Sequence, residues 1–374
     1  MSFLAQELIQ KSDVSDILDQ VLHGKRLALN DCIRLLRSDN PYALGIIGNI
    51  LREKLFGKVA TFVNNIILNY TNVCITYCKF CAFYRAPGDS EGYRLSVDDV
   101  VKRVATARDQ FGISQVLMQG GHNPDLRIEY YEEAFKTIKE KCPDVAIHGL
   151  SASEIDTISK VERSNTKEVL SRLKEAGLDT LPGAGAEILD DDVKSRISPL
   201  KIKSDEWLNI MKQAHELGIK SSATMMYGTG EDYEQRGRHL VKIAELQEKT
   251  GGFMSFIPWS FEPNNTKMQA EGIIKYPSGG LELLKMIAIS RIVFSGLIDH
   301  LQSSWLTNGI GMAQLALTYG ADDFGGTLIG EEVVSATGAR STELKSDKII
   351  TAINKLGSRP MNVIISTRPF EFIR

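Results

Sequence analysis

Apolar and polar positions follow two different periods along the chain, and the change between them divides it near Thr61. Before that point apolar residues recur every three or four positions, as on one face of a helix; Leu29, Cys32 and Leu36 are an example. From Thr61 onward, short apolar runs alternate with amphipathic stretches. The first part is therefore predicted to be helical, with helices at about 4–22, 29–38 and 41–56.

Apolar runs of strand length recur about eight times after this change of period. A helical pattern separates each run from the next, which predicts parallel strands joined by right-handed crossovers. The predicted strands are 66–70, 115–118, 145–148, 180–182, 222–226, 254–257, 298–302 and 322–324. The predicted helices between them are 96–111 with Ser96 as N-cap, 128–141, 165–176, 204–217, 232–249, 281–294 and 309–319.

Residues that follow the predicted strands favour a closed barrel. Gly, Pro, Ser or polar residues come after nearly every strand, as at Gln119–His122 and Ser303–Trp305. In a barrel of eight units these ends meet at one face, where barrel enzymes carry their active sites; an open doubly wound sheet would gather them at one crevice. The sequence predicts an α/β fold, a (β/α)8 TIM-type barrel over 58–374 with a C-terminal helix and tail. A helical extension at 1–57 is expected to complete a single compact unit.

Composition narrows the class of function. The chain has 374 residues and a net charge of −3, without a block of Lys and Arg, so nucleic acid and anionic membranes are not expected partners. Its N-terminus carries charges too early for a signal peptide, and no apolar run approaches the ~18 residues of a membrane span. We expect a cytoplasmic protein. Cys32 and Cys142 stand alone in helix-like surroundings and are expected to be buried thiols.

Three of the five cysteines lie within eight positions, directly after the first strong strand. This crowding of Cys74, Cys78 and Cys81 argues against a disulfide framework and for metal or redox chemistry. Three thiolates can hold a [4Fe–4S] cluster and leave one iron open to another ligand. The alternative is a structural zinc site with His122 or His148 as fourth ligand, although structural zinc usually shows paired Cys or His spacings.

The cysteine segment, with Phe80 between its last two cysteines, resembles the signature of the radical S-adenosylmethionine superfamily. The resemblance implies that Cys74, Cys78 and Cys81 hold a [4Fe–4S] cluster whose fourth iron binds S-adenosyl-L-methionine. One electron then cleaves this cofactor to methionine and a 5′-deoxyadenosyl radical, which takes a hydrogen atom from the substrate. It also implies that Phe80 lies near the adenine.

A second motif, Met118–His122, supports the resemblance. It closes the next strand, where the superfamily usually has Gly-Gly-Glu. Gly120 and Gly121 are expected to let the backbone approach S-adenosylmethionine closely, with their carbonyls accepting hydrogen bonds from its ammonium group. His122 stands in place of the Glu, so it is a candidate substrate contact or a hydrogen-bonded scaffold residue.

Longer segments resemble the menaquinone and deazaflavin branch of the superfamily, over roughly residues 40–370. They are Asn69–Cys74, Cys81–Arg85, His148–Ile155, Pro182–Ile188 and Ala223–Gly228. Three others most resemble the cyclic dehypoxanthine futalosine synthases: Ile257–Pro263, Gln302–Thr307 and Asp322–Thr327. Aminofutalosine synthases and deazaflavin-precursor synthases are the alternatives within the branch. A non-catalytic, metal-stabilised binding protein is the alternative from another class.

The resemblance implies a ring closure in menaquinone biosynthesis. The radical would take hydrogen from the ribose C4′ of dehypoxanthine futalosine, and the sugar radical would add to the attached benzoate ring. One electron and one proton would then be lost, and Tyr227, Glu154 and Glu231 are candidate bases for the proton. A flavodoxin or ferredoxin is the expected electron donor.

Four further residues are candidates for the site, and three of them, all but Arg196, lie at predicted strand ends. Glu187 is a candidate contact to the ribose of S-adenosylmethionine, or a carboxylate that favours a helix start. Arg196 is a candidate contact to the cofactor's carboxylate, or one half of a surface ion pair. Trp259 and Trp305 are candidate walls for the benzoate ring of the substrate, with packing at the barrel rim as the alternative.

Overall fold

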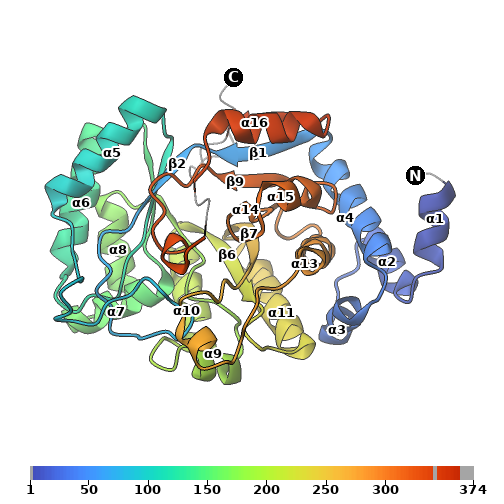
Figure 1. Cartoon of the computed structure of the whole chain (residues 1–374), viewed down its shortest axis with the longest axis horizontal. Helices are drawn as coiled ribbons and strands as arrows, with labels where there is room; N and C mark the ends of the chain where they lie inside the picture. Colours follow the sequence, from blue (N-terminus) through green and yellow to red (C-terminus); the bar gives the residue numbers. More distant parts are fainter. Residues whose placement is uncertain (1–2, 340–342, 363–374) are drawn as a thin grey trace.

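A computed structural model describes residues 3–339 and 343–362 of the chain. Its centre is a curled sheet of seven parallel strands, hydrogen-bonded in the order in which they occur along the chain (Figure 1). The strands are β2 (Asn65–Leu68), β3 (Gln115–Met118), β4 (Ala146–Gly149), β5 (Thr180–Leu181), β6 (Lys220–Tyr227), β7 (Phe253–Ser260) and β8 (His300–Leu301). The predicted α/β class, with sequential parallel strands, is therefore confirmed.

A smaller parallel sheet completes the strand structure. It contains β1 (Val59–Val63), β9 (Asp323–Gly326) and β10 (Arg359–Asn362), in the order β10-β1-β9. Two isolated β-bridges connect the chain at and after β9 to the two edges of the large sheet. They pair Ile329 with Ile66 of β2 and Asp323 with Gln302, which follows β8. The eighth predicted strand, at 322–324, corresponds to β9, which pairs with β1 and not with β8. The barrel therefore consists of a curled half-barrel and a second, smaller sheet. Neither β1 nor β10 was predicted.

Helices cover the outer face of the large sheet and join its strands (Figure 1). The longer ones are α5 (Val97–Phe111), α6 (Ile128–Lys141), α7 (Ala152–Glu162), α8 (Thr166–Ala176), α10 (Ser204–Glu216), α11 (Tyr233–Thr250) and α13 (Gly280–Val293). The shorter ones are α9 (Asp191–Ile197), α12 (Lys267–Ala270), α14 (Trp305–Asn308), α15 (Ile310–Ala316), α16 (Ser346–Lys355) and a 3-10 turn at Ser335–Thr337. Ser96 caps α5 by accepting a hydrogen bond from the Asp99 amide, as predicted.

Four helices precede the first strand and pack on the barrel. They are α1 (Phe3–Gln10), α2 (Ser15–Leu22), α3 (Leu29–Arg37) and α4 (Pro41–Phe56), so the helix predicted at 4–22 is two helices. α4 lies against α13, and α3 lies against α11 and α13. The predicted boundary at 57–58 falls between α4 and β1. The predicted tail lies outside the described residues.

The two cysteines outside the cysteine cluster lie in the protein interior. Cys32 and Cys142 are fully buried, as predicted, and neither forms a disulfide. Within residues 3–339 and 343–362, no helix has both the length and the apolar character needed to cross a membrane.

Candidate functional site

All seven strands of the large sheet are parallel, so the loops after them gather at one end of the barrel. Several non-glycine residues in these loops have positive φ angles: Tyr77 (48°) after β2, Leu150 (63°) after β4 and Glu187 (44°) after β5. Such angles are uncommon outside glycine and cluster where function constrains the backbone. This end of the barrel is therefore the candidate active site.

The three clustered cysteines lie on the loop after β2, which backbone hydrogen bonds hold in place. The Cys74 amide donates to the Arg85 carbonyl (2.9 Å), and the Cys81 amide donates to the Cys78 carbonyl (3.1 Å). The hydroxyl oxygen of Thr76 lies 3.0 Å from Cys74 Sγ and 3.5 Å from Cys78 Sγ. The thiols of Cys74 and Cys78 thus lie on the same hydroxyl group, and none of the three cysteines forms a disulfide.

The chemistry of these thiols fits a [4Fe–4S] cluster. Burial raises the pKa of Cys78 to about 11 and also raises the pKa of Cys81, so the thiolates need a bound cation. In the described part of the chain, no three His, Cys, Asp or Glu side chains are arranged around a single metal ion. A cluster is larger than one ion and takes each cysteine on a different iron, so Cys74, Cys78 and Cys81 would hold it.

Glu187 lies in a buried ion-pair cluster beside the cysteine loop. Its carboxylate pairs with Lys194 (3.1 Å) and with Lys201 (2.8 Å). Burial alone would raise the pKa of Glu187, but the two lysines lower it to about 2. Although burial favours a neutral amine, the charges of Glu187, Cys78 and Cys74 raise the pKa of Lys201. Glu187 is thus no helix-start carboxylate; whether it contacts the cofactor ribose stays a prediction.

Phe80 and His122 lie close to this ion-pair cluster. The ammonium nitrogen of Lys201 is 5.4 Å from the centre of the partly exposed Phe80 ring, a cation–π distance. His122 Nδ1 is 2.7 Å from the Thr157 hydroxyl, which itself donates to the Ser153 carbonyl. The Thr157 hydroxyl thus holds the imidazole ring of His122 in a fixed orientation. Burial, reinforced by Lys201, lowers the pKa of His122 to about 3 and keeps it neutral.

Gly120 and Gly121 occupy positions where a side chain would collide with the protein itself. A Cβ on Gly120 would lie 2.8 Å from the Tyr70 ring, and one on Gly121 would lie 2.2 Å from the Val73 carbonyl. Packing therefore gives a reason for both glycines besides the predicted approach to S-adenosylmethionine.

Glu154, a candidate base, is buried behind Gly120. Its Oε1 accepts hydrogen bonds from the Tyr70 hydroxyl (2.7 Å) and the Gly120 amide (3.0 Å). Burial raises its pKa to about 7. The carboxyl group thus braces the glycine turn from the protein interior.

The other two candidate bases lie under α11. Glu231 is fully buried and binds the amides of Gly228 and Thr229 and the guanidinium of Arg236. The same guanidinium lies 5.2 Å from the centre of the buried Tyr227 ring. Because α11 covers the outer face of the sheet, Tyr227 points away from the barrel interior. Burial also raises the pKa of Tyr227, which makes its phenol harder to ionise.

The two tryptophans and Arg196 have different surroundings. Trp305 is buried at the start of α14 and donates its indole hydrogen to the Gly326 carbonyl (2.9 Å). Trp259 is partly exposed near the end of β7. Arg196 is exposed and donates to the Gly230 carbonyl (3.2 Å). The structure thus leaves Trp259 accessible and encloses Trp305 in the protein.

Partly exposed side chains align across the large sheet. Four such residues form two pairs on adjacent strands: Ile67 with Leu117, and Thr224 with Ile257. The residues directly before and after Leu117 and Thr224 are buried. Partners on adjacent strands point to the same face, and helices cover the outer face. The accessible face is therefore the inner one, and Trp259 lies on it, two positions beyond Ile257.

His148 extends this row along β4. It pairs with Leu117 on one side and Thr180 on the other, and its Nδ1 is 2.7 Å from the Thr180 hydroxyl. Burial lowers the pKa of His148 to about 4, so the imidazole is neutral near pH 7. The inner face thus carries a neutral histidine among apolar and hydroxyl side chains.

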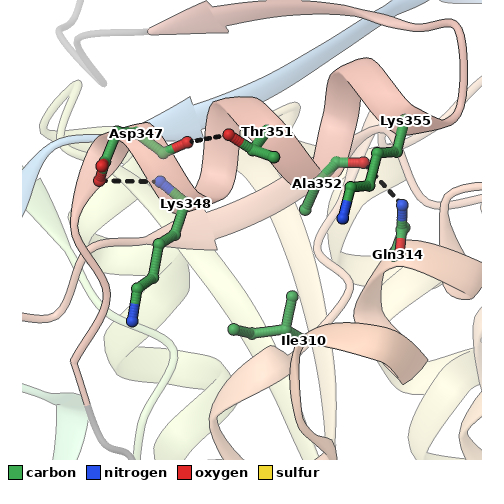
Figure 2. Close-up of a pocket in the computed structure, with 7 residues that line it drawn as sticks. All are labelled: Ile310, Gln314, Asp347, Lys348, Thr351, Ala352 and Lys355. Carbon is green, nitrogen blue, oxygen red and sulfur yellow. Dashed lines mark hydrogen bonds between the residues drawn. The ribbon is translucent and has the colours of Figure 1, made fainter.

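A shallow surface groove lies elsewhere, between α15 and α16 (Figure 2). Gln314 donates to the Ala352 carbonyl (2.8 Å) across it, and Lys348 and Lys355 also line it. Figure 1 shows α16 at the top of the molecule and α9 at the bottom. The last residue of α9, Ile197, accepts a hydrogen bond from the Lys79 amide of the cysteine loop. The groove is therefore separate from the cysteine site.

Sequence reasoning missed Lys194 and Lys201 and considered His148 only as a zinc ligand. The lysines are buried by tertiary contacts with Glu187, which no local pattern shows. His148 gave a usable signal, because it lies near the carboxyl end of a predicted inner strand, where barrel enzymes place functional side chains.

Two family models and several curated relatives match most of the chain. Residues 68–243 match the Radical SAM superfamily, and residues 250–370 match the CofH/MqnC C-terminal region. The chain is 40% identical over 357 residues to the cyclic dehypoxanthine futalosine synthase of Streptomyces coelicolor, covering 94% of this chain and 88% of that protein. It is also 40% identical over 314 residues to the 5-amino-6-(D-ribitylamino)uracil–L-tyrosine 4-hydroxyphenyl transferase of Methanocaldococcus jannaschii, covering 83% of this chain and 87% of that protein.

A solved structure shares the fold. The crystal structure of methylornithine synthase (PylB) aligns with a TM-score of 0.71 at 20% identity, over 92% of this chain and 97% of that one. Membership of this superfamily implies a [4Fe–4S] cluster and S-adenosylmethionine as cofactors. The chain therefore belongs to the radical SAM superfamily and is an enzyme of its futalosine and menaquinone branch.

Proposed function

We propose that this enzyme converts dehypoxanthine futalosine to cyclic dehypoxanthine futalosine in menaquinone biosynthesis. The observation that carries the proposal is the 40% identity to the Streptomyces coelicolor synthase, which extends over 94% of this chain. The alignment with that synthase therefore includes the strands of the inner face as well as the cysteine loop. Flavodoxin or ferredoxin remains the proposed electron donor.

The residues around the cysteine loop would prepare the start of the reaction. Cys74, Cys78 and Cys81 would hold the cluster, which together with bound S-adenosylmethionine would supply the chemistry for taking a hydrogen atom from the substrate. Phe80, beside the cysteines, is the proposed adenine contact. His122, whose ring is held by the Thr157 hydroxyl, is a proposed substrate contact.

The inner face would hold the substrate. Trp259 offers a flat aromatic surface for the benzoate ring, and Ile67, Leu117 and Ile257 offer apolar contacts that exclude water. Holding the sugar and the ring folded against each other favours attack within the molecule. Partly exposed apolar and hydroxyl side chains suit a substrate with an aromatic ring and an uncharged sugar.

His148 is the proposed base for the proton lost on ring closure. Glu154 and Glu231 are buried in hydrogen bonds to the protein, and Tyr227 faces the helices. His148 lies on the inner face and is neutral near pH 7, the form that accepts a proton. His300 shares this face but begins β8 and binds Asp322 (2.7 Å), at the far end of the strands.

The test is an anaerobic reaction of cluster-loaded protein with reductant, S-adenosylmethionine and dehypoxanthine futalosine, followed by mass spectrometry. We expect 5′-deoxyadenosine together with a product lighter than the substrate by two hydrogen atoms. Deoxyadenosine without that product would refute the proposed substrate. Incubation with L-tyrosine and 5-amino-6-(D-ribitylamino)uracil, the reactants named for the Methanocaldococcus jannaschii relative, would then test the sister reaction.

A further inference from the structure

The buried ion-pair cluster beside the cysteines carries an excess positive charge. Lys194 directs three hydrogen bonds to the Gly185 carbonyl (2.8 Å), the Ala186 carbonyl (3.3 Å) and Glu187 (3.1 Å), which uses every donor of an ammonium group. Lys201 binds the other oxygen of Glu187 (2.8 Å). Two ammonium groups thus face one carboxylate, and one positive charge remains uncompensated within the cluster.

The uncompensated charge belongs to Lys201 and faces the cysteine loop. Lys201 Nζ lies 5.4 Å from the ring centre of Phe80, which sits between Cys78 and Cys81 in sequence. The Lys79 amide donates to the Ile197 carbonyl (2.8 Å), which ties this loop to the end of α9, four residues before Lys201. The position of the ammonium group relative to the thiols is therefore fixed from both sides.

We propose that Lys201, held by Glu187 and Phe80, is the positioning residue that sets the reduction potential of the iron–sulfur cluster. Reduction adds one negative charge to a cluster already bound by three thiolates. A buried cation stabilises that added charge far more than an exposed one, because water does not screen it. The inference goes beyond the proposed substrate, since it concerns the cluster before any substrate binds.

Lys79 provides a matched comparison on the same loop. It follows Cys78 directly, but 35% of its side chain is exposed and it pairs with Glu271 (2.8 Å). Water and Glu271 therefore screen its charge, although it is closer to the cysteines in sequence. Glu187→Gln provides the opposite change in charge, because it removes the carboxylate from the same buried ion-pair cluster.

The experiment is a redox titration of anaerobically reconstituted protein without S-adenosylmethionine, followed by electron paramagnetic resonance of the reduced cluster. At a fixed potential, Lys201→Met should lower the ratio of reduced to oxidised cluster about tenfold, which is about 59 mV for one electron. Glu187→Gln should shift the potential in the opposite, positive direction. Lys79→Met should leave it unchanged, and Lys201→Arg, which keeps the charge, should stay near the wild-type value.

Two results would overturn the inference. One is a potential for Lys201→Met that equals the wild-type value. The other is a shift of the same sign in Lys201→Met and Glu187→Gln, which would indicate a general disturbance of the loop. Iron content of each variant is measured first. If Lys201→Met takes up no cluster, the other two variants test the inference. It then requires a positive shift of the potential in Glu187→Gln and a potential near the wild-type value in Lys201→Arg.

Discussion

Two buried charged networks occupy the two ends of this barrel, and they differ in whether their charges balance. At the start of β8 and β9, Asp322 pairs with Arg291 (2.5 Å) and with His300 (2.7 Å), and both members of the Asp322–Arg291 pair are almost fully buried. Arg291 also donates hydrogen bonds to the carbonyls of Gly320 (2.7 Å) and Asp299 (2.6 Å). Each charge in this network has a partner within the protein.

The network beside the cysteines contains more positive than negative charge. Lys194 and Lys201 share the single carboxylate of Glu187. An uncompensated buried charge is costly unless something else balances it, and here three cysteines lie beside it. The balanced network holds the fold, whereas the excess positive charge beside the cysteines suits a bound, negatively charged group.

The largest effect is expected at the cysteine end. Cys78→Ala removes one of three cluster ligands, so we expect loss of the cluster and of all S-adenosylmethionine cleavage. Iron content and 5′-deoxyadenosine formation measure the two consequences. Cys142→Ala, at a buried cysteine far along the chain from the loop, is the control and should keep its iron. Full iron and activity in Cys78→Ala would contradict the ligand assignment.

The opposite end should respond in stability rather than in chemistry. Arg291→Met leaves Asp322 buried without its cation, which should lower the free energy of unfolding by about 3–5 kcal/mol. Urea unfolding of the cluster-loaded protein measures this change. Lys212→Met, in an exposed pair with Glu216, should cost about 1 kcal/mol or less. An altered cluster potential in folded Arg291→Met would contradict the division between the two networks.

The sequence predicted most of the fold because burial imposes local patterns. The strands from β2 to β7 agree with apolar runs; α5 begins after its predicted cap, Ser96, and the ends of α6 follow its periodicity. β1 was missed because only Asn64 separates it from β2, so two strands form one apolar stretch. β10 was missed because it contains Pro360 and little apolar character, which an edge strand tolerates.

The site divides in the same way. The spacing of Cys74, Cys78 and Cys81 is a local property, so the sequence reveals it. The burial of Lys201 arises from contacts with Glu187 and Phe80, which lie apart in the chain. Lysines are usually exposed, and no spacing distinguishes this one.

Glu154 lies at the cysteine end of the barrel, but its side chain is buried and hydrogen-bonded to Tyr70 and Gly120. We therefore expect it to affect stability and not catalysis. Its pKa is raised from 4.5 to about 7, so the folded protein holds a proton that the unfolded chain releases. Stability should therefore fall as pH rises from about 4.5 to 7, by roughly 3 kcal/mol from this group. In Glu154→Gln, whose amide oxygen can still accept both hydrogen bonds, that part of the fall should disappear.

Urea midpoints at pH 5 and pH 7.5 compare the two proteins. A variant with the wild-type pH dependence would show that Glu154 does not bind the proton. Loss of deoxyadenosine formation in a stable Glu154→Gln protein would instead place the carboxyl group in catalysis.

The smallest effect is expected between the two networks, on the inner face. Trp259→Ala removes the proposed wall for the benzoate ring, so the folded geometry of the substrate is held less well. We expect 5′-deoxyadenosine still to form, while the ratio of cyclised product to deoxyadenosine falls severalfold. Trp305→Phe is the matched control: it removes a buried hydrogen bond to Gly326 and should lower the thermal midpoint without changing that ratio. Equal ratios in wild type and Trp259→Ala would exclude Trp259 from the substrate site, and the inner face would then act through His148 and its neighbours on β4.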